Sequence, residues 1–161
     1  MRLKPNKYVF PGGAWDKVDT DVPFVHGLSD YQKKLLRLET DFAESSYLGI
    51  TAIRELWEET GIEAEMGPVI WTQQVQFTFG PYFFDNDEKI HIAWCDGGEY
   101  QPKHLEALEA AAFIEAQWWS VEDLLSSDFP VLPERLREFF PDLTQGNIPS
   151  TPIDISPKNS D

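Results

Sequence analysis

The chain has 161 residues, of which 42% are hydrophobic and 25% are charged; this length and composition predict one compact domain with a buried core. Thirteen basic residues against 28 acidic ones give a net charge of −15. A field of this sign repels phosphate backbones and acidic membrane surfaces, which argues against a nucleic-acid or membrane-surface binder. Cys95 is the only cysteine, so an internal disulfide and a cysteine zinc cluster are excluded.

The first predicted element is an extended segment over 7–10, which ends at the turn Pro11-Gly12-Gly13 because glycine permits positive φ angles. Nothing in these first residues resembles the apolar part of a signal peptide, and no run approaches the ~18 apolar residues of a membrane span. We therefore expect a protein of a reducing, cytoplasmic compartment. Further on, a capping-box pattern and leucines at helical spacing predict a helix over 30–41.

A second helix is predicted over about 47–60, with Ser45 or Ser46 as its N-cap and Gly61 at its end. Alternating apolar residues or short aromatic runs predict strands after it. Their ranges are 69–79, 89–95 and 113–119.

Two short helices close the predicted domain. Ser120 caps the first, over 121–125, and Pro133 suits the first turn of the second, which runs to about Phe140. From Gln145 onward, three prolines and mostly polar residues predict a disordered tail over 145–161.

Three glutamates gather on one face of the 47–60 helix. Glu58 and Glu59 lie three and four positions after Glu55, a spacing at which like charges repel and lower helix stability. A merely solvated face would gain from interspersed lysines, whereas converging carboxylates make a hard-oxygen site suited to Mg²⁺ or Mn²⁺. By spacing alone, an acidic surface helix remains an equal alternative.

The full stretch Arg54–Ile62 reads R-E-L-W-E-E-T-G-I. It resembles the second half of the Nudix box, G-x5-E-x7-R-E-U-x-E-E-x-G-U, where U is a bulky aliphatic residue. At average residue usage this half arises by chance in on the order of one chain in 10⁵ of this length. Phe10–Gly13 resembles the family's entry strand and turn, and 115–124 resembles its closing strand and short helix.

The sequence departs from the usual box in one spacing. Gly13 and Arg54 are 41 positions apart, 27 more than usual, which predicts an insertion over 17–44. The first box glutamate falls on Ser46, so its role is absent or passes to Glu44 or Asp41. A long insertion at this point is similar to the branch that contains the coenzyme A diphosphatases.

A second departure lies at the start of the chain. Nudix domains usually have about two strands before the glycine turn, whereas only ten residues precede Pro11. Either the start of the domain is lost, or another element or subunit covers the exposed sheet edge. A homodimer through that edge is one form of the second explanation.

The resemblance assigns Glu58 and Glu59 as ligands of Mg²⁺ or Mn²⁺, and Glu55 as a ligand or as the base that activates water. Arg54 would orient Glu55, with a plain helix salt bridge to Glu58 as the alternative. Gly13 would lend its backbone carbonyl to the metal, or simply form a tight turn.

A further glutamate often comes from the loop before the closing strand. Glu109 is the main candidate for this further ligand, and Glu106 and Glu115 are the other two. Each of the three also fits a plain surface acid.

Other residues that could carry chemistry have simpler interpretations. The histidines His26, His91 and His104 lack metal-ligand spacing and are interpreted as surface or packing residues. Cys95 is interpreted as a small buried residue. Six aromatic residues could stack on a nucleobase, although most are expected in the core: Trp71, Phe77, Phe79, Tyr82, Phe83 and Phe84.

The resemblance thus predicts an α/β domain over 1–144, a Nudix-type α/β/α sandwich with a mixed central sheet and few or no strands before the glycine turn. The implied activity is metal-dependent hydrolysis of a diphosphate linkage in a small molecule, a nucleoside diphosphate joined to another moiety. The alternative is a non-catalytic Nudix-derived module that binds a nucleotide or a protein.

Overall fold

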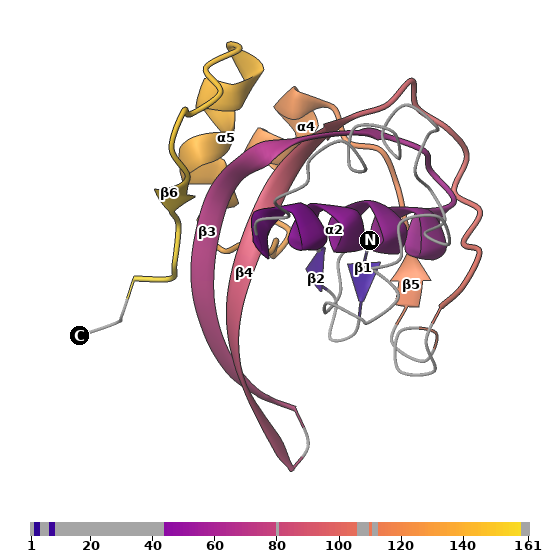
Figure 1. The fold of residues 1–161 in the computed structure, drawn as a ribbon, viewed down its shortest axis with the longest axis horizontal. Coiled ribbons are helices and arrows are strands. Elements are labelled where there is room, and N and C mark those ends of the chain that lie inside the picture. Colours follow the sequence, from indigo (N-terminus) through magenta and orange to yellow (C-terminus); the bar gives the residue numbers. More distant parts are fainter. Residues whose placement is uncertain are drawn as a thin grey trace.

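The computed structural model describes residues 2–3, 7–8, 44–79, 81–105, 110 and 113–158 (Figure 1). Gly13, the predicted 30–41 helix and all of the predicted 17–44 insertion except Glu44, where α2 begins, lie outside these residues. The strands are β1 (Arg2–Leu3), β2 (Lys7–Tyr8), β3 (Glu65–Phe79), β4 (Tyr82–Trp94), β5 (Phe113–Glu115) and β6 (Ile153–Asp154). The helices are α2 (Glu44–Thr60), α4 (Val121–Ser126) and α5 (Leu136–Thr144).

Helix α2 confirms the helix expected over 47–60 and begins three residues earlier. It lies close to the hairpin at Gly49, where an added Cβ would displace the end of the Met66 side chain. Ile50 and Ile53 are buried, whereas Leu56 and Trp57, the residues next to the acidic positions, are half-buried.

Strands β3 and β4 form one long antiparallel hairpin, longer than either predicted strand. From the pair Trp71–Ile90 to the pair Phe79–Tyr82 the register is regular, and it shifts only near Met66 and Val69. Because successive side chains point to opposite faces, Ile90 and His91 lie on different faces of the hairpin. Ile90 packs against the core on the side of α5, and His91 lies on the side of α2.

The C-terminal segment corrects the prediction of a disordered tail. Strand β6 pairs in parallel with β3 at Trp71 and Thr72, and the Ile155 N–H donates to the Thr72 carbonyl at 2.8 Å. Ile155 is fully buried in the main core cluster. Burial of this one branched side chain, together with the ladder hydrogen bonds, holds a segment that is otherwise polar and rich in proline.

The main core lies between the hairpin, β6 and α5. Its buried side chains are Ile70, Trp71, Val131, Leu136 and Ile155. Ser120 caps α4 as predicted, since its hydroxyl accepts from the Asp123 N–H at 3.0 Å. The second helix starts later than expected, at Leu136, and continues through Pro141 to Thr144.

The α/β class is confirmed, but the strands divide between two sheets. One is mixed, in the order β4-β3-β6, and the other is antiparallel, in the order β2-β1-β5. The described residues therefore do not join into the single central sheet that was predicted. Two strands of two residues each, β1 and β2, precede residues 11–13 in the chain and pair with each other.

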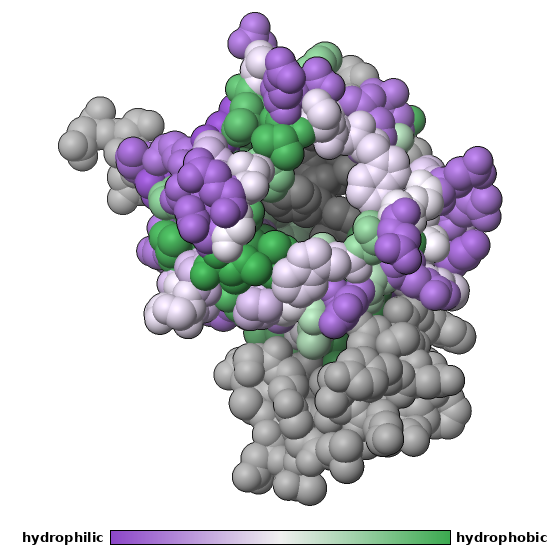
Figure 2. Space-filling view, turned by 90° about the horizontal axis from the view of Figure 1, so that it is seen from above, coloured by the Kyte–Doolittle hydropathy of each residue, from purple (hydrophilic) through white to green (hydrophobic). Residues whose placement is uncertain are grey.

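No helix among the described residues is long and apolar enough to cross a membrane. On the face seen in Figure 2, hydrophilic residues occupy much of the rim, and hydrophobic residues gather in patches between them. The polar rim agrees with the acidic composition of the chain.

Candidate functional site

The acid turn, which we define as Glu55, Glu58 and Glu59, lies in the last two turns of α2. Arg54 bridges two of its members: one guanidinium nitrogen lies 2.8 Å from a Glu55 carboxylate oxygen and the other lies 2.8 Å from a Glu58 carboxylate oxygen. Such a fork fixes the rotamers of both acids, because both side chains and Arg54 itself are largely shielded from water. Arg54 therefore contacts both acids at once.

Glu59 is the most deeply placed acid of the turn, with 3% of its surface exposed. It follows the half-buried Glu58 directly and lies one turn after Glu55. A charged carboxylate is rarely buried without a function or a compensating group. Its burial separates Glu59 from an ordinary acid on a solvated helix face.

The segment Gln101–His104, which we call the strap, holds the end of α2. The Lys103 and His104 N–H groups both donate to the Glu58 carbonyl, at 2.8 and 2.9 Å. The Gln101 N–H donates to the Thr60 carbonyl at 2.9 Å. The strap thus satisfies carbonyls that a helix end leaves without intrahelical partners, and it fixes the backbone that carries Glu58.

One contact fixes the position of the strap, and a second holds the segment just before it. Gly61 has a φ of +75°, and a Cβ there would collide with the backbone oxygen of Gln101, so only glycine fits. At the other side, the Trp118 indole N–H donates to the Gly98 carbonyl at 2.9 Å. The strap is not predicted by any sequence pattern, apart from the paired glycines Gly97-Gly98 that precede it.

Of the predicted metal ligands, Glu55 and Glu58 lie together around Arg54, whereas others are not among the described residues. Within the described ranges, no three His, Cys, Asp or Glu side chains converge as a ready metal-binding group. Gly13, Glu106 and Glu109 lie outside those ranges. Glu115, the other loop candidate, is half-buried in β5.

The donor set of the acid turn nevertheless suits a hard divalent cation. All three side chains are carboxylates, the ligand type that Mg²⁺ and Mn²⁺ prefer. The Arg54 guanidinium shows that Glu55 and Glu58 can converge on one positive group. A metal bound to both would compete with Arg54 for their oxygens.

The cysteine, the histidines and the aromatic residues were also considered as site residues. For the cysteine and for most of the aromatic residues, the observed exposure differs from the prediction. Cys95 follows β4 and is exposed, which corrects its interpretation as a buried residue. His91 packs under α2 with its Nδ1 3.0 Å from the Gly67 carbonyl, His104 is exposed, and His26 is outside the described ranges.

The aromatic residues are the second case. Trp71 is buried, whereas Phe77, Tyr82, Phe83 and Phe84 are exposed, so the expectation that most belong to the core is wrong. The side chain of Phe79 is outside the description.

The comparison with known families decides the membership of the chain. The NUDIX domain profile matches residues 44–143, which include α2, the acid turn, the strap and the hairpin. The chain belongs to the Nudix family. No curated protein and no solved structure matches it significantly. Nudix domains generally hydrolyse nucleoside diphosphate derivatives, and Nudix hydrolases generally use Mg²⁺ or Mn²⁺.

Proposed function

We propose that this Nudix protein is a metal-dependent diphosphatase that cleaves the diphosphate linkage of a nucleoside diphosphate joined to another moiety. Coenzyme A, nucleotide sugars and dinucleotides are the substrates that we propose to test first. The long insertion favours the coenzyme A diphosphatase branch among them. The observation that carries the proposal is the Arg54 fork, which orients two carboxylates of the acid turn at a helix end that the strap also holds.

The acid turn would hold Mg²⁺ or Mn²⁺ through Glu58 and Glu59, with Gly13 and Glu109 as proposed further ligands. A bound divalent cation supplies charge neutralisation to the diphosphate and acidifies water. Glu55 would either bind the metal or accept the proton of the attacking water, and in the second role the Arg54 guanidinium orients its carboxylate. For a protein of net charge −15, binding an anionic substrate requires such local positive charge.

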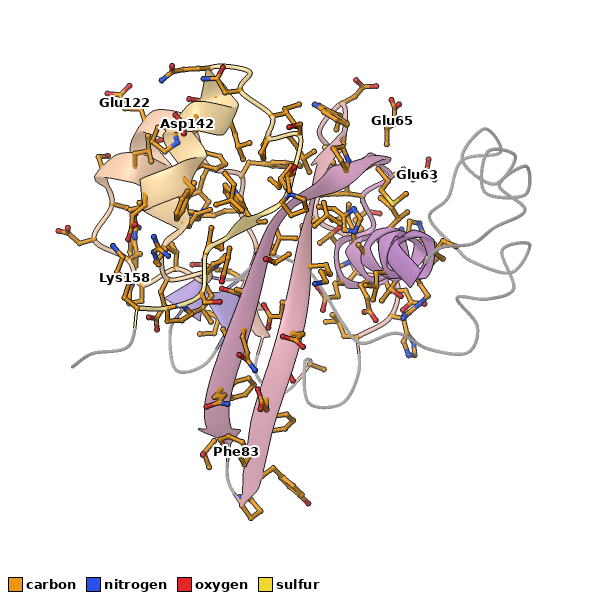
Figure 3. All side chains as sticks on the ribbon, turned by 60° about the vertical axis from the view of Figure 1, so that its left-hand side comes forward. Glu63, Glu65, Phe83, Glu122, Asp142 and Lys158 are labelled. Atoms are coloured by element: carbon orange, nitrogen blue, oxygen red, sulfur yellow. The ribbon has the colours of Figure 1, made fainter. Side chains whose placement is uncertain are left out.

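Glu59→Gln tests the proposed metal site. It keeps the size of the side chain and removes one anionic oxygen ligand, so hydrolysis of the active substrate should fall by orders of magnitude. The matched control is Glu63→Gln, because Glu63 is exposed just beyond the end of α2 and lies at the periphery of the molecule (Figure 3). The control should retain parental activity in a screen of coenzyme A, nucleotide sugars, dinucleotides and nucleoside triphosphates with Mg²⁺.

Metal-dependent stability gives a second readout. Mg²⁺ or Mn²⁺ should raise the Tm of the parent and of Glu63→Gln through binding linkage, and should raise that of Glu59→Gln much less. Equal shifts in all three proteins, together with no hydrolysis of any substrate, would reject the proposal.

The alternative is a Nudix-derived binding module. Ser46 in place of the first box glutamate favours it. In that case a nucleotide from the screen should bind and raise the Tm without being hydrolysed, and Glu59→Gln should leave that shift unchanged.

A further inference from the structure

Ser156 ties the C-terminal segment to the hairpin through its hydroxyl. That hydroxyl accepts from the Gln74 N–H at 2.9 Å and donates to an Asp154 carboxylate oxygen at 2.6 Å. The Ser156 N–H donates to the same carboxylate oxygen at 2.8 Å. One small hydroxyl therefore links the backbone of β3 to the last residue of β6.

The pairing that this hydroxyl supports is short. Strand β6 has two residues and lies at an edge of the β4-β3-β6 sheet. After it, the Ile155 N–H donates to the Thr72 carbonyl at 2.8 Å, and the Ile155 side chain is fully buried. Pro157 has no N–H and adds no donor to the ladder. The docking of this segment therefore depends strongly on Ile155 and on the hydrogen bonds of Ser156.

The same serine precedes a proline. Only two of the twelve prolines in the chain follow a serine or a threonine, in the dipeptides Thr151-Pro152 and Ser156-Pro157. A proline disfavours the helical conformation of the residue before it, and both hydroxyl-bearing residues lie in non-helical chain. Proline-directed protein kinases act on a serine or threonine in such a dipeptide, so Ser156 and Thr151 are both candidate acceptors.

The two acceptors differ in what a phosphate would meet. Thr151 is exposed and precedes β6, whereas the Ser156 hydroxyl oxygen lies 2.6 Å from the Asp154 carboxylate. A phosphoserine carries a charge of about −1.5 to −2 at pH 7, and its ester oxygen has no proton to donate to that carboxylate. Repulsion would therefore replace a hydrogen bond at Ser156 and not at Thr151.

The neighbouring guanidinium is already engaged. Arg135 donates to the Ser156 carbonyl at 3.2 Å and lies 2.9 Å from the Glu138 carboxylate. A phosphate on Ser156 would gain Arg135 as a partner only in competition with Glu138. The repulsion by Asp154 is thus not offset by a free cation at this position.

We propose that Ser156 is a phosphorylation site and that its phosphate releases the C-terminal segment from β3. The Ser156 oxygen attacks the γ-phosphorus of ATP, so that an O–P bond forms and the bond from that phosphorus to the β–γ bridging oxygen breaks. ADP leaves, and the hydroxyl proton passes to a carboxylate of the kinase. Once the segment is released, Ile155 no longer fills its place in the core beside Trp71.

Access to the hydroxyl is coupled to opening of the segment. Ser156 is half-buried, and its hydroxyl is occupied on both sides while β6 is docked. In Figure 1, β6 lies along the side of β3 that faces away from α2. Opening of such a short edge strand does not require the rest of the protein to unfold. Ser156 also lies outside the acid turn and the strap, so its phosphate acts on the fold and not on the proposed metal site.

The full chain with phosphoserine incorporated at 156, compared with the chain carrying phosphothreonine at 151, tests the release. Phosphoserine at 156 should lower the Tm by about 5 °C or more and should speed hydrogen exchange of the Ile155 amide by about tenfold or more. Phosphothreonine at 151 should change neither quantity. Equal effects of the two phosphates would overturn the proposal, and so would an unchanged or raised Tm with phosphoserine at 156.

A purified proline-directed kinase with ATP tests the site itself, and mass spectrometry measures the phosphate on each residue. Ser156 of the folded parent should be phosphorylated, and Ile155→Ala should raise its rate several-fold because it favours opening of the segment. The rate at Thr151 should be the same in both proteins. No phosphate on Ser156 in either protein, or a Ser156 rate that does not respond to Ile155→Ala, would contradict the assignment.

Discussion

Gly61 and Gln101 approach each other so closely that the backbone oxygen of Gln101 occupies the place where a Cβ of residue 61 would lie. The contact joins the end of α2 to the strap, and both of its sides are backbone. Neither side can turn away as a flexible side chain could. The position of Glu58, whose carbonyl accepts two strap N–H groups, is therefore coupled to the strap.

Comparing Gly61→Ala with Gly97→Ala separates the loss of stability caused by the clash with Gln101 from the loss caused by a positive φ angle alone. Both glycines have positive φ, +75° and +86°, but a Cβ at Gly97 would meet nothing within 4 Å. Gly97→Ala should cost about 1–2 kcal/mol from its φ angle alone. Gly61→Ala should cost clearly more because the strap must move. Urea unfolding of both variants measures the difference, and equal losses would show that the strap yields freely.

Arg54→Ala should destabilise the protein by about 1.5–3 kcal/mol, because it removes charged hydrogen bonds from two shielded carboxylates. Arg54→Lys should recover only part of the loss, since an ammonium lacks the fork that reaches Glu55 and Glu58 together. The control is Lys158→Ala, because Lys158 is 73% exposed and its ammonium lies 3.5 Å from the Glu138 carboxylate, and this variant should change stability little. Chemical denaturation measures all three. Full recovery by lysine would mean that charge alone matters.

The C-terminal segment should respond to acid through Asp154. The Ser156 hydroxyl and N–H donate to its carboxylate, at 2.6 and 2.8 Å, and they lower the pKa of Asp154 from its ordinary value. The resulting stabilisation is present above the ordinary carboxyl pKa and is lost as the pH falls through the lower folded pKa. Ser156→Ala should therefore raise the pKa of Asp154 toward that of an unfolded chain. An NMR titration of the carboxyl carbon measures it; an unchanged pKa would contradict the assigned cause.

Ile155→Ala should cost about 2–5 kcal/mol, as truncation of a buried branched side chain does. Ile153→Ala is its control, because Ile153 lies two residues earlier and is 38% exposed, whereas Ile155 is fully buried. Thermal unfolding compares the two. Similar small losses would mean that the end of the chain does not belong to the core.

The parts of the fold that sequence predicted well depend on local signals. Ser120 with Asp123 three residues later marks the start of α4, and Gly61 marks the end of α2. The identity of the Nudix half-box likewise depends only on adjacent residues, 54–62. Arg54 was expected to contact Glu55 or Glu58, and in the structure it contacts both.

The parts that sequence missed depend on contacts between distant residues. Strand β6 has only two residues, and its partner Thr72 is far away in the chain, so no periodicity revealed it. The strap likewise bonds to α2 through backbone N–H groups, which any residue type supplies. The exposed phenylalanines of the hairpin were expected in the core because they are hydrophobic. The sequence pattern does not show how far along the hairpin another element covers its face.

The pairing of β6 with β3 has a consequence for the order in which the protein folds. The Gln74 N–H donates to the Ser156 hydroxyl across 82 positions of sequence, whereas the β3–β4 hairpin closes through its own turn. Contacts this distant pay a larger chain-closure entropy and form later than local ones. We expect the hairpin to form early and the docking of Ile155 to complete the core, so hydrogen-exchange protection should reach Ile155 last.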